Sequence, residues 1–395
     1  MTPVVVTAAA MANACGIGMR AIGAALREGR SGLRRNDFEP ATGLDTFIGR
    51  VDAVESIDWP ERFADYDCRN NRLAWLALDQ DGFRAKVAAA RARHGAERIG
   101  VFVGTSTSGI LTTEMYSRAT RDQPVPARLS ASSYAACHSM YAPARFVQAA
   151  CDLHGIAATL STACSSSAKA FGSAARALHA GQCDAAIVAG VDSLALSTLH
   201  GFDSLELLSR TPCRPFDSDR DGISIGEGAG LALLEREGSG AVELTGIGES
   251  ADAWHMSSPH PQGAGAVRAM RGALRSAGLR PEDIDYINLH GTATRANDTA
   301  EDHAVHAVFG STTSAGSTKG WTGHALGAAG ITEALVCVYA LREQWRPGTL
   351  NCVTPDPALR SRIDRESQAA PLRNALSNSF GFGGNNCSLV FGLRR

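Results

Sequence analysis

The feature that most constrains this chain is a repeated alternation of short apolar runs with alanine-rich stretches of helical length. The runs are rich in β-branched and aliphatic residues and end at glycine or polar turns, which is typical of buried strands. Because strands that alternate with helices favour a mostly parallel sheet covered on both faces, the pattern predicts an α/β protein. We expect strands at 3–10, 98–106, 156–162, 185–193, 230–237, 241–250, 285–291 and 376–384, and helices at 72–95 and 266–279.

The order strand, long helix, strand begins again after a charged, glycine-rich turn at 235–246. The chain has 395 residues, enough for two or three domains or for one large duplicated body. No fixed-period repeat accompanies the restart, so the duplication is inferred from the pattern of elements alone. We therefore predict two similar α/β halves, residues 1–240 and 241–395.

Composition argues against several classes of function. Lys and Arg total 38 against 40 Asp and Glu, and a net charge of -2 gives no global attraction to nucleic acid or to an anionic membrane. Ten cysteines without a CxxC pair or a metal-ligand spacing favour reduced thiols in a cytoplasmic protein. Residues 1–18 lack the basic start of a signal peptide, and no apolar run is long enough to predict a membrane span.

Cys164 lies where an apolar strand turns into a small-residue helix, in LSTACSSSAKAFGSAARAL (160–178). At a helix N-terminus, the helix dipole and free backbone N–H groups favour a thiolate and lower the cysteine pKa. The same N–H groups could hold the oxyanion of an acyl-transfer step. The alternative is a small buried thiol of the kind that fills protein cores. The segment by itself leaves both interpretations open.

Two glycine-flanked histidines are candidate partners for this thiol. His290 ends a strand in INLHGTATRAND, and His324 opens a small-residue helix in STKGWTGHALGAAG, five residues after Lys319. Lysine occurs only three times in the chain, which makes Lys319 a candidate as well. Three glycine-rich turns that each carry a reactive side chain favour an active site over three structural residues.

The remaining histidines and the glycine-rich tail carry weaker signals. His303 and His306 have a helical spacing, but no further ligand lies nearby, so we predict no metal site. His255 and His260 lie in DAWHMSSPHPQG, which we expect to be a loop near the site. The tail NSFGFGGNN (378–386) surrounds two phenylalanines with glycines and fits either a gate or a tight turn.

Five segments together resemble the β-ketoacyl-acyl-carrier-protein synthases, which are ketosynthases of the thiolase-fold superfamily. These segments are STACSSSAKA, HGTATRAND, STKGWTGHALGAAGITEA, FDSDRDGISIGEGAG and NSFGFGGNN. The resemblance covers nearly the whole chain, and the cysteine and the two histidines follow in the family's order. It implies a five-layered αβαβα fold of two similar halves that dimerises through a central strand.

The resemblance also implies a role for each matched residue. Cys164 is the acylated nucleophile, and His290 and His324 serve decarboxylation and condensation. The backbone N–H of Phe382 joins that of Cys164 in the oxyanion hole. The supporting roles fall to Lys319 and Glu333 for the electrostatics of the site, Phe382 and Phe202 for its gate and lining, and Thr292 and Thr294 for the phosphopantetheine arm.

The implied substrates are thioesters carried on the phosphopantetheine of an acyl carrier protein, with no redox cofactor. Malonyl-carrier protein would lose carbon dioxide, and the resulting carbanion would attack the acylated cysteine in a decarboxylative Claisen condensation. Because carrier proteins are acidic, we expect a basic patch around the pocket mouth, although each arginine taken alone fits an ordinary solvated side chain better. The candidates are Arg69, Arg72, Arg121, Arg128 and Arg210.

Departures from the common fatty-acid pattern indicate a specialised branch. HGTATRAND lacks the usual proline after the second threonine, and GGNN replaces GGTN. The set looks most like ketosynthases of the bacterial aryl polyene pathways, which are similar to minimal polyketide synthases in which a ketosynthase pairs with a chain-length factor. The partner is thus a second copy of the chain or a chain-length-factor homologue. We expect acyl-chain length to depend on a pocket near Ile110 and 139–146.

Two other functions stay open at the level of sequence. A thiolase-type enzyme acting on acyl-CoA would use a second cysteine in the C-terminal half, for which Cys387 is the candidate. The position of Cys387 at the start of an apolar strand, together with two histidines in place of one, argues against this. A non-catalytic chain-length factor would only shape a partner's pocket, but such proteins usually lack the nucleophile that Cys164 supplies here.

Overall fold

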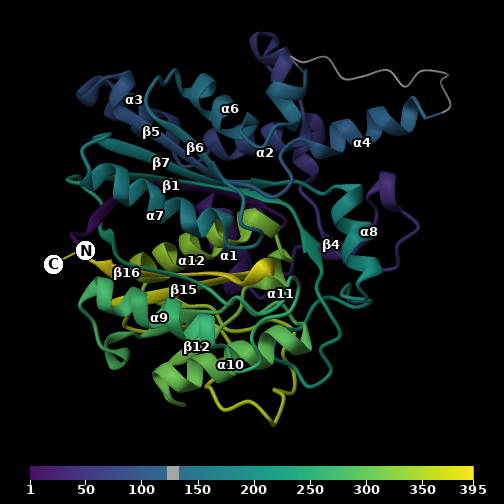
Figure 1. The fold of residues 1–395 in the computed structure, drawn as a ribbon, viewed down its shortest axis with the longest axis vertical. Helices are drawn as coiled ribbons and strands as arrows, with labels where there is room; N and C mark the ends of the chain where they lie inside the picture. Colours follow the sequence, from purple (N-terminus) through teal and green to yellow (C-terminus); the bar gives the residue numbers. More distant parts are fainter. Residues whose placement is uncertain (122–132, 395) are drawn as a thin grey trace.

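The computed structural model describes residues 1–121 and 133–394, and it consists of two α/β halves with the same strand topology (Figure 1). The N-terminal half orders its strands as β1 (Val4–Asn13), β9 (Gly228–Glu235), β7 (Ala185–Asp192), β5 (Ile99–Gly104) and β6 (Ala157–Leu160). The C-terminal half orders them as β10 (Val242–Ala251), β16 (Asn385–Leu393), β15 (Asn374–Gly381), β11 (Tyr286–Asn288) and β12 (Ser314–Gly316). In both orders the first two pairings are antiparallel and the last two are parallel.

Helices cover both sheets and fill the space between them (Figure 1). The central layer holds α7 (Ser166–His179) and α12 (Ala329–Glu343), which pack on each other and on strands of both halves. The outer layers hold α2 (Arg69–Leu78), α3 (Phe83–His94) and α6 (Ala142–Cys151) on one side, and α9 (Ala264–Ala277) and α10 (Arg295–Phe309) on the other. The layers therefore follow the order αβαβα, which confirms the predicted five-layered fold of two similar halves.

The shorter elements connect these layers. The helices are α1 (Met19–Arg27), α4 (Ile110–Ala119), α8 (Leu196–Ser204), α11 (Lys319–Thr322) and the π-helix η5 (Tyr134–His138). The short strands are β2 (Gly16–Ile17), β3 (Leu33–Arg35), β4 (Phe47–Gly49), β8 (Ile225–Gly226), β13 (Trp345–Arg346) and β14 (Gln368–Ala369). No helix in the described ranges is both long enough and apolar enough to cross a bilayer. All ten cysteines lie in these ranges and are free thiols.

Burial explains the composition of the central elements. β5 and β7 are buried at every residue because helices cover both of their faces, so they show no polar alternation. α12 is apolar on nearly all sides, as a helix enclosed on every side must be. α7 consists of small residues that allow close packing: a Cβ at Gly104 of β5 would lie 2.2 Å from the backbone nitrogen of Ser167.

The helix predicted at 72–95 is wrong in one respect, because it is two helices, α2 and α3. Asp81 and Gly82 separate them with φ angles of 53° and 70°, in the left-handed region. An α-helix cannot continue through such residues, and glycine is the residue that adopts this conformation at least cost. The strand predicted at 376–384 likewise ends at Gly381, and the turn Phe382–Gly384 follows.

Candidate active site

Cys164 lies on the turn between β6 and α7 and is 6% exposed. Ala163, directly before it, has a φ of 51°, a strained conformation for a residue with a Cβ. The hydroxyl of Ser166 fixes the turn, because it accepts the N–H of Thr162 at 2.8 Å and donates to the carbonyl of Ala163. The chain thus holds a sharp turn that presents the thiol at the start of the central helix.

His324 contacts this thiol directly. Its Nε2 lies 3.1 Å from Sγ of Cys164. Its Nδ1 accepts the backbone N–H of Leu326 at 3.2 Å, which assigns the proton of the neutral ring to Nε2. The backbone of His324 is held on both sides, by the carbonyl of Ser224 at 2.8 Å and the N–H of Gly226 at 3.0 Å. The loop therefore aims an N–H donor at Cys164.

His290 has the same tautomer for a different reason. The Nζ of Lys319 lies 3.3 Å from Nδ1 of His290, and it also donates to the His290 carbonyl and to the carboxylate of Glu333. An ammonium group only donates, so Nδ1 is the acceptor and Nε2 carries the proton. The His290 and His324 rings meet edge to face with centroids 5.3 Å apart. One nitrogen of each ring and Sγ of Cys164 all lie within 4.8 Å of one another.

Burial and the charge of Lys319 set the protonation of these groups. The pKa values of His290 and His324 lie well below the usual range, first because burial disfavours the imidazolium and then because Lys319 repels it. Burial raises the pKa of Glu333 to about 7, while Lys319 opposes that shift. Both imidazoles are therefore neutral near pH 7, and they present two N–H donors to the space beside Cys164.

The Cys164 thiol is less acidic than the sequence predicts. Burial raises its pKa to about 11, although Lys319 and the backbone N–H groups of Phe382 and Cys164 lower it. The prediction from the helix N-terminus was wrong because it left out desolvation, which disfavours a thiolate in a closed site. The two N–H groups still lie against the sulfur, where they can donate to an oxyanion that forms on a carbon bonded to it.

A cavity of about 430 Å³ contains Cys164 and both catalytic-site histidines. Phe202 and Phe382 line it, with ring centroids 5.6 Å apart, and the role of Phe382 as a gate stays a prediction. Thr292 and Thr294 line it as well, and their hydroxyl oxygens lie 3.0 Å apart. The structure thus brings together all nine residues predicted for the catalytic, supporting and phosphopantetheine-binding sets.

Two loops complete the walls of the cavity. Gly381 lets the glycine-rich tail approach the nucleophile, since a Cβ there would lie 2.8 Å from the carbonyl oxygen of Thr162 and 3.2 Å from the nitrogen of Cys164. The loop that follows β10 lines the cavity at residues 257–259. His255 and His260 flank this stretch and are not among the lining residues, so the loop lies near the site as predicted while its histidines do not enter it.

Two buried carboxylates that the sequence analysis missed fix the loops of the site. Glu301 on α10 accepts the backbone N–H groups of His290 and Gly291 at 2.8 and 2.7 Å, and burial raises its pKa to about 7. Asp192, at the end of β7, accepts the N–H of Gly327 in the turn that follows His324. Asp192 is an acidic residue in an otherwise apolar strand, and this could have marked it as functional. Its partner Gly327 is 135 residues away in the chain, so the sequence did not show which loop it binds.

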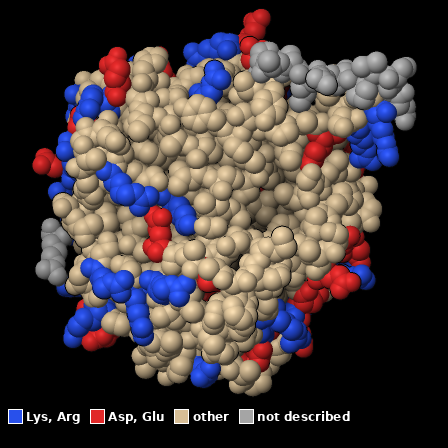
Figure 2. Space-filling view, viewed as in Figure 1, with Lys and Arg blue, Asp and Glu red and all other residues tan. Residues whose placement is uncertain are grey.

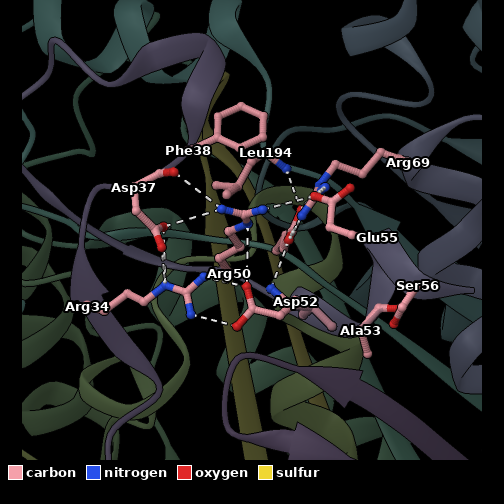
Figure 3. A network of polar contacts seen from close by, with 12 residues as sticks. Arg34, Asp37, Phe38, Arg50, Asp52, Ala53, Glu55, Ser56, Arg69 and Leu194 are labelled. Atoms are coloured by element: carbon pink, nitrogen blue, oxygen red, sulfur yellow. Dashed lines mark hydrogen bonds and ion pairs between the residues drawn. The ribbon is translucent and has the colours of Figure 1, made fainter.

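Arg69 is not a surface residue, which contradicts its prediction as a carrier-protein contact. Its guanidinium binds both carboxylate oxygens of Glu227 at 2.8 and 2.6 Å and also contacts Glu55 (Figure 3). The side chain is 8% exposed, and Glu227 is fully buried. Arg69 therefore closes an internal ion pair, at the end of a chain of alternating charges that reaches the surface through Arg50 and Arg34 (Figure 3).

Of the other four candidate arginines, the three that the structure describes do not line the cavity. Arg72 pairs with Asp67 and is 26% exposed. Arg121 and Arg210 are exposed but do not line the cavity, and Arg128 lies outside the described residues. On the face shown in Figure 2, basic and acidic side chains intermingle around a largely uncharged centre. Carrier-protein contacts therefore remain a prediction for Arg72, Arg121, Arg128 and Arg210.

The fold and the site define a class of enzyme. A buried thiol, two backbone N–H groups against it and two neutral imidazole N–H donors suit acyl transfer to cysteine followed by stabilisation of an enolate. These are the groups that an acyltransferase needs to form a carbon–carbon bond between two thioesters.

Comparison with known proteins then assigns the family. The family model of the β-ketoacyl synthase N-terminal domain matches residues 1–239, and that of the β-ketoacyl synthase C-terminal domain matches residues 241–353. The chain belongs to the β-ketoacyl synthase family and is a ketosynthase, as the sequence motifs predict.

Individual relatives agree with this assignment. The 3-oxoacyl-acyl-carrier-protein synthase 2 of Staphylococcus aureus is 35% identical over 75% of this chain and 77% of its own length. The mitochondrial 3-oxoacyl-acyl-carrier-protein synthase of Arabidopsis thaliana is 41% identical, and the match covers 58% of this chain but only 55% of that protein. The ketosynthase ApeO of Xenorhabdus doucetiae, solved in complex with its chain length factor ApeC, is 41% identical, with a TM-score of 0.90 over 100% of this chain and 98% of that chain.

Proposed function

We propose that the protein lengthens an acyl chain bound to Cys164 by two carbons, with malonyl-acyl carrier protein as the donor. The observation that carries the proposal is the convergence of two neutral imidazoles, His290 and His324, on the space beside the buried thiol. A nucleophile alone would serve many acyl transfers. Two N–H donors at one point serve a reaction in which negative charge develops on an oxygen atom there.

In the first half-reaction, Cys164 exchanges with the thioester of an acyl-carrier protein. A bond forms between Sγ and the acyl carbon, the bond from that carbon to the phosphopantetheine sulfur breaks, and the thiol proton passes to the departing thiolate. The N–H groups of Cys164 and Phe382 stabilise the tetrahedral oxyanion. Because the resting pKa is about 11, we expect the thiolate to form only as the thioester arrives.

In the second half-reaction, malonyl-carrier protein occupies the same cavity. Its thioester carbonyl accepts hydrogen bonds from Nε2 of His290 and His324, so the enolate left by departing carbon dioxide is stabilised where it forms. The enolate carbon attacks the acyl carbon, and the Cys164 thiolate leaves and takes up a proton. The product is a β-ketoacyl-carrier protein and carbon dioxide. Decarboxylation supplies the carbanion, so the reaction proposed here requires no redox cofactor.

Intact mass measurement tests the proposal. The protein is incubated with acyl-carrier proteins of several chain types, and malonyl-carrier protein is then added. We expect an acyl adduct that is absent from Cys164→Ala, followed by loss of the adduct and appearance of an extended β-ketoacyl product. An adduct that malonyl-carrier protein fails to discharge would overturn the condensation step while leaving the nucleophile in place.

The two alternative functions fit the structure less well. Cys387, which a thiolase would need, is fully buried in β16 and belongs to the core cluster of the central layer, and it is not among the cavity-lining residues. Burial also raises the pKa of its thiol far above the usual range. A non-catalytic chain-length factor has no use for the aligned Cys164, His290 and His324.

The partner that we propose is a chain-length-factor-like homologue. β6 is the last strand of its sheet, and no strand in the described part of the chain pairs with its outer edge. Exposed apolar side chains occur in the segments that lead into β6 and into α6, which packs on β6, and such exposure is typical of a protein interface. We call this set the apolar patch: Ile156 directly before β6, and Tyr134, Met140 and Tyr141 before α6. The similar ketosynthase ApeO is held by a chain length factor, which supports a heterodimer over a homodimer.

The pathway that we propose is aryl polyene biosynthesis, on the strength of the motifs HGTATRAND and NSFGFGGNN and of the 41% identity to ApeO. Ile110 and residues 139–146 do not line the cavity of the single chain, but they adjoin the apolar patch. We therefore expect the part of the pocket that measures chain length to form with the partner bound. Acylation by polyenoyl or aryl chains in preference to saturated ones would support this branch, and the reverse preference would contradict it.

A further inference from the structure

Arg295 is the first residue of α10, and its exposed side chain lines the mouth of the cavity that contains Cys164. Its guanidinium donates one long hydrogen bond, of 3.4 Å, to the carbonyl of Ser218. Among the described residues, no carboxylate lies within ion-pair distance of it. The other arginine of the cavity, Arg220, is buried and occupied by Asp356 and Asp298. Of the two arginines that line this cavity among the described residues, Arg295 is therefore the one without an ion pair.

The backbone does not require an arginine at this position. Thr294 caps α10 in an extended conformation, with φ of -84° and ψ of 140°, and Arg295 follows as the first helical residue. Proline is favoured at such a position, because the first helical N–H has no partner within the helix and the preceding residue is already extended. The role of the side chain must therefore be sought in the cavity rather than in the helix.

Exposure increases outward along this wall of the cavity. Cys164 and Thr292 are buried, Thr294 is half-buried and Arg295 is exposed. A phosphopantetheine thioester has the matching order, with the thioester at one end, two amides along the arm and a phosphodiester at the other end. A guanidinium presents paired N–H donors that match the oxygens of a phosphate.

We propose that Arg295 binds the phosphodiester of the phosphopantetheine arm while the threonine hydroxyls contact the arm further in. The proposal rests on the proposed function, since it assumes a carrier-protein thioester in this cavity. Two exposed acidic side chains, Glu206 and Asp221, also line the cavity, and their negative charge repels a phosphodiester, whereas Arg295 attracts it.

The test compares two thioesters of the same acyl chain, one on phosphopantetheine and one on pantetheine, which lacks the phosphate. The rate of Cys164 acylation is followed by intact mass at subsaturating thioester. We expect the wild-type protein to prefer the phosphorylated thioester about tenfold, as one charge-assisted contact at an exposed site can provide. Arg295→Pro and Arg295→Ala should abolish the preference and leave the rate with acyl-pantetheine within about twofold. Raised salt should reduce the wild-type preference.

Arg271→Ala is the matched control, because Arg271 is an exposed arginine of the neighbouring helix α9 that does not line the cavity. It should behave as the wild type. A wild-type protein without a preference, or Arg295 variants that keep it, would overturn the inference, as would equal slowing with both thioesters. A wild-type protein that neither thioester acylates would instead overturn the proposed function and the inference with it.

Discussion

Cys164 is subject to two opposing effects. Enclosure keeps water away from a reactive acyl intermediate, but it also raises the pKa of the thiol to about 11. The charge of Lys319 and the backbone N–H groups of Phe382 and Cys164 lower that pKa. In the resting enzyme Cys164 is therefore a protonated thiol, and it becomes a thiolate during attack on the thioester. The backbone N–H groups that stabilise the thiolate can then donate to the oxyanion of the tetrahedral intermediate.

Alkylation by iodoacetamide should show that the resting thiol is protonated. Because the thiolate is the reactive form, the rate at Cys164 should rise about tenfold per pH unit between pH 7 and pH 10. Peptide mass mapping separates Cys164 from the other nine cysteines, and Cys164→Ala supplies the background. A rate that levels off below pH 8 would contradict the raised pKa.

Lys319 should control the pH dependence of condensation. Its charge lowers the pKa of both histidines, so the wild-type rate should stay level as the pH falls from 8 to 6, where the rings remain neutral. Removal of the charge in Lys319→Met should raise those pKa values, so the rate should decline with falling pH across the same interval. Single-turnover discharge of the acylated protein measures this, with the exposed Lys86→Met as the control. Parallel pH profiles for the wild type and Lys319→Met would contradict the role assigned to Lys319.

Residues differ in how well the sequence predicts them. Some site residues can be predicted from the sequence immediately around them, because the turns and glycines of that segment position the side chain. These residues are Cys164, His290, His324 and Lys319. Glu301 binds loop N–H groups that its own segment does not reveal. Arg69 was misassigned because its partner is 158 residues away, and a buried arginine has the same local sequence as an exposed one.

At the scale of elements, the Arg69–Glu227 pair ties three segments to the loop of His324. Glu227 follows β8, and its carboxylate accepts the N–H groups of Val51 at 2.9 Å and Leu194 at 3.0 Å. Leu194 lies just before α8, which carries Phe202 of the cavity wall. The neighbouring Gly226 bonds to the carbonyl of His324. A buried ion pair thus connects the segments that carry Val51 and Leu194 to the strand β8, which borders the loop of His324.

Arg69→Met should lower the free energy of unfolding by about 3–5 kcal/mol, because it leaves the Glu227 carboxylate buried without its partner. Urea denaturation measures the loss. Arg72→Met, which opens a partly exposed pair, should cost about 1 kcal/mol or less. Unchanged stability with a raised KM for the carrier protein would instead restore the original assignment of Arg69 to the carrier-protein surface.

The elements themselves were largely predictable, but their connections were not. Apolar runs located the long strands, since full burial leaves a continuous apolar signature. The break at Asp81 and Gly82 was missed because alanine-rich segments on both sides favour helix equally. The pairing of β1 with both β9 and β10 could not be predicted from the sequence either. The register of these pairs depends on contacts between residues more than 200 positions apart in the chain.

For the whole molecule, the partner that we propose would bind at the open edge of β6 and the apolar patch. Ile156→Lys places a charge at this edge and should prevent assembly, because an edge lysine disfavours strand addition. Size-exclusion chromatography with light scattering should show that Ile156→Lys stays a single chain in the presence of the partner. Its thermal unfolding midpoint should differ little from that of the wild-type protein. Val353→Lys, at another exposed apolar residue, should assemble normally. A complex that persists in Ile156→Lys would place the partner elsewhere.

The pairing of β1 with β10, where the two halves meet, bears on whether the chain could be circularly permuted. β10 is bonded on one side by β1 and on the other by β16, so Val6 and Leu393 flank Val242. Neighbouring strands are about 4.8 Å apart, which places Val6, near the start of β1, roughly 10 Å from Leu393 at the end of β16. A linker of a few residues could join them, with the chain reopened at 236–241. Such a circular permutant would be translated with its histidines before its cysteine, and acylation of Cys164 would report whether the order of synthesis matters to the assembled site.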